Sequence, residues 1–187
     1  AAGRPAAAAE SVHVADSDDD DAERMAEEAE PFPPLPPLLA EGAEPSEQQQ
    51  AACARARLAA SEAMEDGALA TALEHYTEAL MSGAAGALLY TKRAELLLKL
   101  RRPRAAICDC SAALEVNPDC GKAHRVRGLA HRALGLWEAA HRDLSLGQKL
   151  DYDELTAGVQ KFVAERVRRL EARRGSAAAA RKRRRPQ

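Results

Sequence analysis

The sequence predicts an all-α protein in which pairs of helices repeat and stack into an elongated solenoid. The first observation is a spacing of thirty-four residues between the small side chains Ala72, Ala106 and Ala140. The second is the same spacing in three more columns, which contain Tyr76, Cys110 and Leu144, then Ala79, Ala113 and Gly147, and on the partner helix Ala60, Ala94 and Gly128. Chance is a poor explanation for four columns in phase.

A period of thirty-four residues with small and aromatic positions is the signature of tetratricopeptide repeats. We expect three of them within residues 51–154, at 53–86, 87–120 and 121–154. In the first, Gly67 permits the left-handed conformation of a helix end. In the second, Pro103 takes a tolerated first-turn position and Pro118 follows the end of the second helix. In the third, Gly135 separates the helices and Trp137 begins the second one.

Residues 155–175 predict a seventh, charged helix that covers the open end of the solenoid, as terminal repeats require. Apolar residues recur there at steps of three and four, at Leu155, Val159, Phe162, Val163, Val167 and Leu170. Residues 176–187 begin with an alanine run and end in RKRRRPQ, which predicts a frayed helix and a disordered basic tail.

Residues 1–50 predict a disordered acidic, proline-rich arm with a net charge of −11, against +3 for residues 51–150 and +6 for residues 151–187. Such a segment buries too little apolar surface to offset the entropy lost on ordering. Pro31, Pro34 and Pro37 have PxxP spacing, but their acidic flanks favour a solvated linker over a peptide ligand for an aromatic groove.

Composition excludes several classes of protein. Four cysteines form no secreted disulfide framework, and no apolar run suits a signal peptide or a membrane span. We therefore expect a reduced, cytoplasmic protein, with the basic tail as a candidate nuclear signal. The tail lacks the interleaved aromatic residues of specific nucleic-acid binding, so a nucleic-acid partner is disfavoured.

No residue pattern indicates an enzyme, a cofactor or a metal site. Cys108 and Cys110 have no second ligand pair at zinc spacing, which favours packing. His124 and His131 have no evident carboxylate partner, and packing or solvated surface explains them better than catalysis. Trp137 is interpreted as packing against the preceding turn, although a role as an interface anchor stays open.

Three segments carry a resemblance to a known family: LYTKRAELLLKL, AAICDCSAALEVNPD and HRALGLWEAAHRDLSLGQKLDYDE. Together, over about residues 50–175, they resemble Hip, the family of tetratricopeptide co-chaperones that interact with the 70 kDa heat-shock cognate chaperone. The resemblance implies binding to the chaperone's ATPase domain, through the repeats and the charged helix after them, and stabilisation of its ADP-bound state. It implies partner-binding roles for a charged set consisting of Arg57, Lys92, Glu95, Lys122, Arg125, Arg166, Arg169 and Arg173.

The resemblance also leaves differences. The family's Gly-Gly-Met-Pro repeats and C-terminal domain are absent before the sequence ends at Gln187, so a truncated form is expected. The N-terminal dimerisation segment is not recognisable, which leaves self-association open.

Many related domains grip a terminal carboxylate with a Lys/Asn/Asn/Lys/Arg clamp. The five matching positions hold Arg57, Ser61, Lys92, Lys122 and Val126. Losing both amides and the arginine fork favours ATPase-domain binding over tail capture. A scaffold for another acidic C-terminal peptide, or a nuclear factor directed by the basic tail, remains the alternative.

Overall fold

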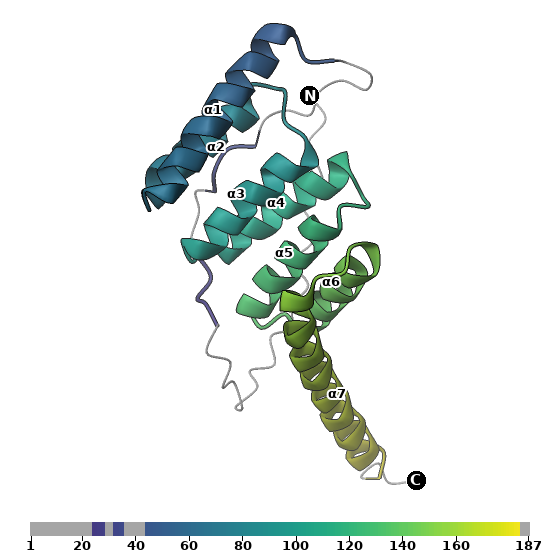
Figure 1. Ribbon diagram of the computed structural model, residues 1–187. Helices are drawn as coiled ribbons and strands as arrows, with labels where there is room; N and C mark the ends of the chain where they lie inside the picture. The colour runs from purple at the N-terminus through teal and green to yellow at the C-terminus, as the bar shows by residue number, and fades with distance from the viewer. Residues whose placement is uncertain (1–23, 29–31, 36–43, 184–187) are drawn as a thin grey trace, which may run out of the picture.

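The computed structural model describes residues 24–28, 32–35 and 44–183, and the helices are all within the last range. They are α1 Glu47–Glu65, α2 Leu69–Met81, α3 Ala87–Lys99, α4 Pro103–Val116, α5 Gly121–Ala133, α6 Trp137–Leu150 and α7 Glu154–Arg183. Figure 1 shows three antiparallel pairs stacked side by side, with α7 leaving the end of the stack. The predicted all-α architecture of three helix pairs and a capping helix is confirmed.

The period of thirty-four residues is visible in the backbone. The second helices of the pairs begin at Leu69, Pro103 and Trp137. Two residues before each of them the chain takes a left-handed conformation, at Gly67 (φ 74°), Arg101 (φ 58°) and Gly135 (φ 72°). The turn inside each pair therefore requires a positive φ, which glycine adopts without strain and Arg101 adopts at a steric cost.

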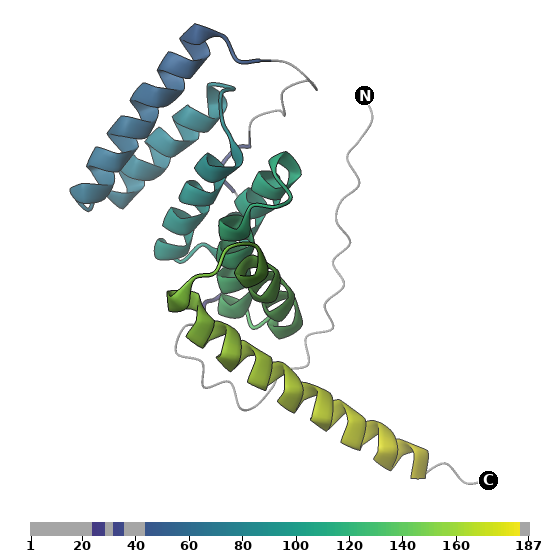
Figure 2. The same cartoon turned by 45° about the vertical axis from the view of Figure 1, so that its right-hand side comes forward.

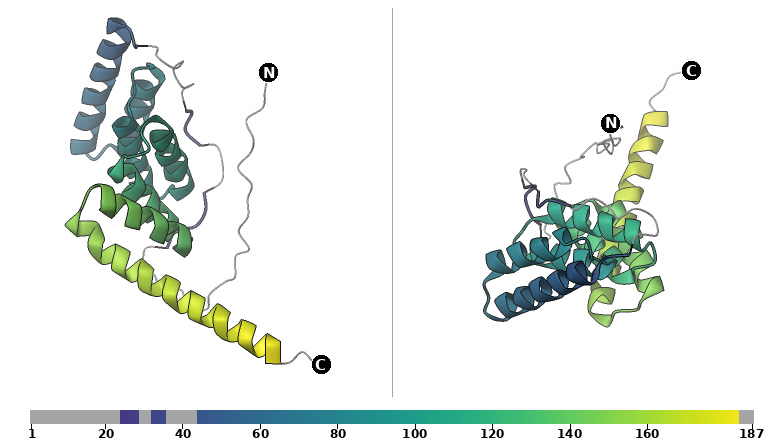
Figure 3. Two further views of the ribbon diagram at one scale, coloured as in Figure 1. Left: turned by 90° about the vertical axis from the view of Figure 1, so that its right-hand side faces the viewer. Right: turned by 90° about the horizontal axis from the view of Figure 1, so that it is seen from above.

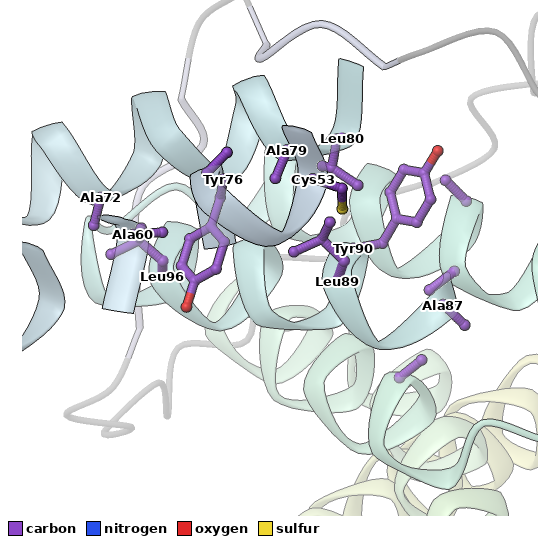
Figure 4. Close-up of a cluster of buried hydrophobic side chains, with 14 of the residues drawn as sticks. Cys53, Ala60, Ala72, Tyr76, Ala79, Leu80, Ala87, Leu89, Tyr90 and Leu96 are labelled. Atoms are coloured by element: carbon purple, nitrogen blue, oxygen red, sulfur yellow. The ribbon is translucent and has the colours of Figure 1, made fainter. Parts of the chain in front are cut away.

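The core consists of large side chains between pairs and small ones where helices touch. Figure 4 shows Tyr76, Leu80, Leu89, Tyr90 and Leu96 filling the space among α1, α2 and α3. In the column of small residues, Ala60 and Ala94 have no exposed surface. A Cβ on the third member, Gly128, would lie 2.7 Å from Leu144 Cγ, so α5 and α6 approach too closely there for even an alanine.

α7 covers the end of the stack with its first half only. Val163 has no exposed surface and packs in a cluster with Trp137 and Leu144. Figures 2 and 3 show the C-terminal half projecting away from the repeats. Leu155, which was expected on the packed face, is 88% exposed and therefore lies outside the contact.

Two helix boundaries differ from the sequence prediction. α7 continues as one helix to Arg183, past the boundary expected at residue 175 and through the stretch expected to be a frayed helix, because alanine has the highest helix propensity of any residue. α1 begins at Glu47, inside the expected arm, because Ser46 and Gln49 form a capping box that starts the helix there.

Two short stretches of the expected arm lie against the helices. Residues 24–28 and 32–35, drawn in purple in Figure 1, contact the second and third repeats, as described below. The prediction of disorder for the rest of residues 1–43, including Pro31 and Pro37, falls outside the described residues. No helix among the described residues is long and apolar enough to cross a membrane.

Candidate partner-binding site

The structure contains a pocket of about 250 Å³ where α1, α2 and α3 meet. The α1 and α3 sides supply basic groups, and the α2 side supplies the ring of Tyr76. The lining residues are Ala54, Arg57, Leu58, Ser61, Tyr76 and Lys92. Tyr76 is buried and belongs to the core cluster of α1, α2 and α3, so the pocket opens directly above the core.

The pocket combines free positive charge with apolar surface. Arg57 and Lys92 are both exposed, and within the part of the chain that the structure describes neither forms an ion pair. Leu58 beside them is 63% exposed. An acidic group that carries an apolar neighbour could therefore gain both charge pairing and apolar burial here.

Three more of the predicted partner-binding residues, Glu95, Lys122 and Arg125, lie outside the pocket. Lys122 Nζ is 2.9 Å from Glu95 Oε2, so these two side chains join α5 to α3 and neutralise each other. Arg125 Nη1 is 2.9 Å from Asp151 Oδ2 and also donates to the Asp151 carbonyl, which ties α5 to the end of α6. Of the predicted set, only Arg57 and Lys92 line the pocket.

The predicted residues on α7 form a separate group at the opposite end of the stack from α1 (Figure 1). The Arg166 guanidinium lies 5.4 Å from the centre of the Trp137 ring, a cation–π contact that fixes it on α6. Arg169 pairs with Glu165 on its own helix, and Arg173 is exposed. Trp137 is a packing residue, since it is 5% exposed, but the partner that the structure shows is Phe162 of α7 and not the preceding turn named in the prediction.

The pocket lacks two of the residue types found in a carboxylate clamp, the amide and the arginine at its fifth position. Val126, at the place where a carboxylate clamp has its arginine, is 4% exposed and packs in the core with Ala94, Leu97 and Ala130. The hydroxyl of Ser61 replaces an amide in the pocket. The site therefore offers the guanidinium of Arg57, the ammonium of Lys92 and a hydroxyl, and it lacks the amides and the arginine at position 126 with which a clamp holds a terminal carboxylate.

Sequence reasoning missed the most regular polar feature of the molecule, a repeated buried ion pair. Arg93 Nε and Nη2 donate to Asp109 at 2.7 and 2.8 Å, and Nη1 donates to Thr77 Oγ1. Thirty-four residues on, Arg127 Nε and Nη2 donate to Asp143 at 2.9 and 2.7 Å. The signal was present, because both the arginines and the aspartates are spaced by one period.

The third-repeat pair has two additional partners. His124 Nδ1 and His131 Nδ1 lie 3.3 and 3.0 Å from the Asp143 carboxylate, which corrects the expectation that these histidines have no carboxylate partner. Although burial raises the pKa of Asp143, hydrogen bonds from His131, Arg127 and His124 outweigh it and hold that pKa well below its ordinary value.

Other candidate sites are structural. Cys110 is fully buried, and burial raises the pKa of its thiol well above the ordinary value, so it packs as an apolar side chain. Cys108 is half-buried. Among the described residues, no cluster of His, Cys, Asp and Glu could hold a metal ion.

Comparison with known proteins places these features in a family. No protein-family model matches the chain. It is 40% identical over 127 residues to a 58 kDa phosphoprotein of Plasmodium berghei, covering 68% of this chain and 30% of the relative. It is 38% identical over 125 residues to Hsc70-interacting protein 1 of Drosophila melanogaster, covering 67% and 33%. A FAM10 family protein of Arabidopsis thaliana is 39% identical over 112 residues, covering 60% and 25%.

Solved structures agree on the fold. The Arabidopsis OM64 tetratricopeptide domain is 26% identical with a TM-score of 0.59, covering 63% of this chain and 98% of that one. The second tetratricopeptide domain of Spaghetti, bound to the HSP90 peptide SRMEEVD, is 28% identical with a TM-score of 0.53, covering 57% and 100%. The chain spans between a quarter and a third of the length of the curated relatives described above. Over two thirds of its own length, the chain is therefore a homologue of the Hsc70-interacting protein and FAM10 family of tetratricopeptide-repeat proteins.

Proposed function

We propose that this chain is a co-chaperone adaptor that binds the ATPase domain of a 70 kDa heat-shock chaperone and stabilises its ADP-bound state. Its homology to proteins named for their interaction with Hsc70 supports the partner. The proposal involves no chemistry by the chain itself. It places the chain in the cytoplasm with the chaperone.

The observation that carries the proposal is the unpaired positive charge in the pocket. Arg57 and Lys92 present two cations at the meeting of three helices, beside the exposed Leu58. Such a surface suits an acidic patch on a folded domain, because Arg57 and Lys92 can each pair with a different carboxylate of the patch. The buried Val126 argues in the same direction, since the position that holds the arginine of a carboxylate clamp is apolar here.

A second contact area is proposed on α7. Arg169 and Arg173 lie on the part of the helix whose side chains are exposed. The net charge of residues 151–187 is +6, which favours approach to an acidic partner and adds to the rate of association. Lys122, Glu95, Arg125 and Arg166 are held in contacts within the fold, and we assign them to positioning the helices around this surface.

A second candidate function is capture of an acidic C-terminal peptide in the same pocket. It is favoured by the Spaghetti domain, which binds an HSP90 peptide of that kind on a related fold. A third, a nuclear factor directed by the basic tail, depends on residues 176–187 alone. The first two functions should survive deletion of those residues, the first with slower association, whereas the third should be abolished.

The test is a calorimetric titration of the chain with two partners, the isolated ATPase domain and a peptide ending in EEVD. We expect saturable binding to the domain with ADP, weaker binding with ATP, and little binding to the peptide. Binding to the peptide alone would replace this proposal with the second function. Binding to neither would reject both chaperone functions.

A further inference from the structure

Residues 24–28 and 32–35, which we call the strap, lie against the helices on a surface separate from the pocket. The strap makes hydrogen bonds to residues 59 and 77 positions later in the sequence. At its first end, Met25 N donates to the Ala133 carbonyl at 2.8 Å. The Arg24 guanidinium fills the space beside Gly135, where a Cβ would collide with it. The strap therefore begins at the turn between α5 and α6.

The middle of the strap binds the turn between α3 and α4. Arg104 Nη1 lies 2.9 Å from Glu27 Oε2, and Arg101 Nη2 donates to the Arg24 carbonyl at 3.2 Å. Ala105 N donates to Glu28 Oε1 at 2.6 Å, and the other Glu28 oxygen is buried. α4 has no side-chain cap of its own, so the strap supplies the carboxylate that its first turn lacks.

The last part of the strap lies against α3. Phe32 packs against the buried cluster that includes Ala94, Leu97 and Ala106. The Pro34 carbonyl accepts a hydrogen bond of 3.1 Å from Arg93 Nη1. Arg93 has no exposed side-chain surface, whereas its repeat equivalent Arg127 is 24% exposed. The strap thus provides one of the partners that let a buried guanidinium be fully satisfied.

We propose that the surface contacted by the strap, which we call the track, is a second peptide-binding site of the domain, separate from the pocket of Arg57 and Lys92. Its ligand class is an extended acidic peptide that carries a Phe-Pro pair, and its occupant is the chain's own strap. The track has three distinct receptors: basic side chains and a free helix start for the carboxylates, an apolar recess for phenylalanine, and a buried donor for a backbone carbonyl. The pocket described above shares no lining residue with it.

The site has a consequence for the solenoid. Each repeat of such a fold contacts its neighbours through helix packing. The strap runs in reverse order from the α5–α6 turn to the start of α4 and to Arg93 of α3, so it adds a second link between the third and second repeats. Its attachment to the same chain gives it a high effective concentration, which favours this occupant over a free peptide.

The first test inserts a specific protease site after Leu39 in the full chain and cuts it after purification. We expect the N-terminal fragment to co-elute with the helical part in size-exclusion chromatography. We also expect an excess of a synthetic peptide of residues 22–37 to displace it, and the same peptide with Phe32→Ala to fail. Complete separation of the cut fragment, with helix content unchanged in circular dichroism, would overturn the proposal.

The second test measures hydrogen exchange at the Ala105 amide in the uncut chain. Glu28→Ala should raise its exchange rate roughly tenfold, because a charge-assisted hydrogen bond is lost. The matched control Glu27→Ala removes only an exposed ion pair and should leave that amide unchanged. Phe32→Ala should likewise raise the exchange rate of the Ala105 amide. Leu35→Ala should leave that rate unchanged, since Leu35 is exposed. Equal rates in Glu28→Ala and wild type, or protection that depends on protein concentration, would exclude the chain's own strap as the ligand.

Discussion

Arg93 and Arg127 occupy the same place in successive repeats and make the same bidentate pair with an aspartate on the following helix. Such a buried pair contributes little net stability compared with apolar side chains, because both charges lose their hydration. Removing one partner is different, since it leaves an uncompensated charge inside the protein. The pair therefore fixes how the two helices of a repeat align more than it raises the stability of the fold.

Asp143→Asn should lower the free energy of unfolding by about 3 kcal/mol, because Arg127 then lacks its carboxylate in a site where Asp143 is 6% exposed. Urea denaturation followed by circular dichroism measures the change. Asp119→Asn is the matched control, because that side chain is exposed and should cost less than about 0.5 kcal/mol. Equal effects of the two substitutions would contradict a structural role for the pair.

The same carboxylate predicts a pH dependence. Its pKa is lowered on folding, so the stability that it contributes is fully present above the pKa of the unfolded carboxyl, which has the ordinary value of 3.8. That stability is lost as the pH falls below this value toward the folded pKa. Wild type should therefore lose more stability than Asp143→Asn between pH 5 and about pH 3. Parallel stability curves for the two proteins would show that Asp143 titrates normally.

In the third repeat, the missing side chain of Gly128 leaves room for the large side chain of Leu144 on the facing helix. The equivalent residues are Ala94 and Cys110 in the second repeat. Gly128→Ala should destabilise the protein by about 1–3 kcal/mol, because the new Cβ would lie 2.7 Å from Leu144 Cγ. Adding Leu144→Cys should recover part of that loss, as the third repeat then copies the second. Thermal unfolding of both variants measures this, and a double variant less stable than either single one would contradict it.

At the scale of elements, α7 has two halves with different roles. The first half buries Val163 and Val167 against α6, and Phe162 meets Trp137 edge to face with ring centres 6.1 Å apart. The second half projects from the stack (Figure 3), so its formation depends on helix propensity more than on packing.

Val163→Ala should lower stability by about 2 kcal/mol, because it opens space in the cluster beneath α7. Leu155→Ala removes an 88% exposed side chain from the same helix and should change stability by less than about 0.5 kcal/mol. Trp137 is the only tryptophan in the sequence, so its fluorescence reports on α7 directly. A similar loss in both variants would show that the first turn of α7 is also packed.

The helix pairs could be predicted because their signals are local or periodic. Pro103 and the glycines at positions 67 and 135 mark boundaries, and the period supplies the rest. The strap could not be predicted in this way, because Glu28 and Phe32 bind residues that are distant in sequence and leave no periodic trace. Disorder was the natural expectation for an acidic, proline-rich composition.

The candidate site was predictable in part. Position in the repeat identified Arg57 and Lys92, which do line one pocket. Lys122 and Arg125 occupy comparable positions, but Glu95 and Asp151 pair with them, and such pairing depends on rotamers that a sequence does not reveal. For the repeated Arg–Asp pairs, the spacing of thirty-four residues is visible in the sequence. Only the fold shows that each arginine pairs with an aspartate of the following helix.

At the scale of the whole molecule, charge is distributed unevenly along the sequence. The N-terminal fifty residues carry a net charge of −11, and the basic residues concentrate toward the C-terminus. The pocket and α7 lie at opposite ends of the helix stack (Figure 1), so a partner that touches both must span the length of the solenoid. A folded domain can do this, whereas a short peptide in the pocket cannot.

The most direct measurement is the affinity of a chaperone ATPase domain, with ADP, for two charge-matched double variants. Arg57→Ala with Lys92→Ala removes both cations from the pocket, and Arg55→Ala with Lys99→Ala removes two exposed cations from the same helices outside it. We predict that the first variant binds about tenfold more weakly, a loss of about 1.4 kcal/mol, while the second stays close to wild type. Equal affinities for the two folded variants would contradict the pocket as the partner-binding site.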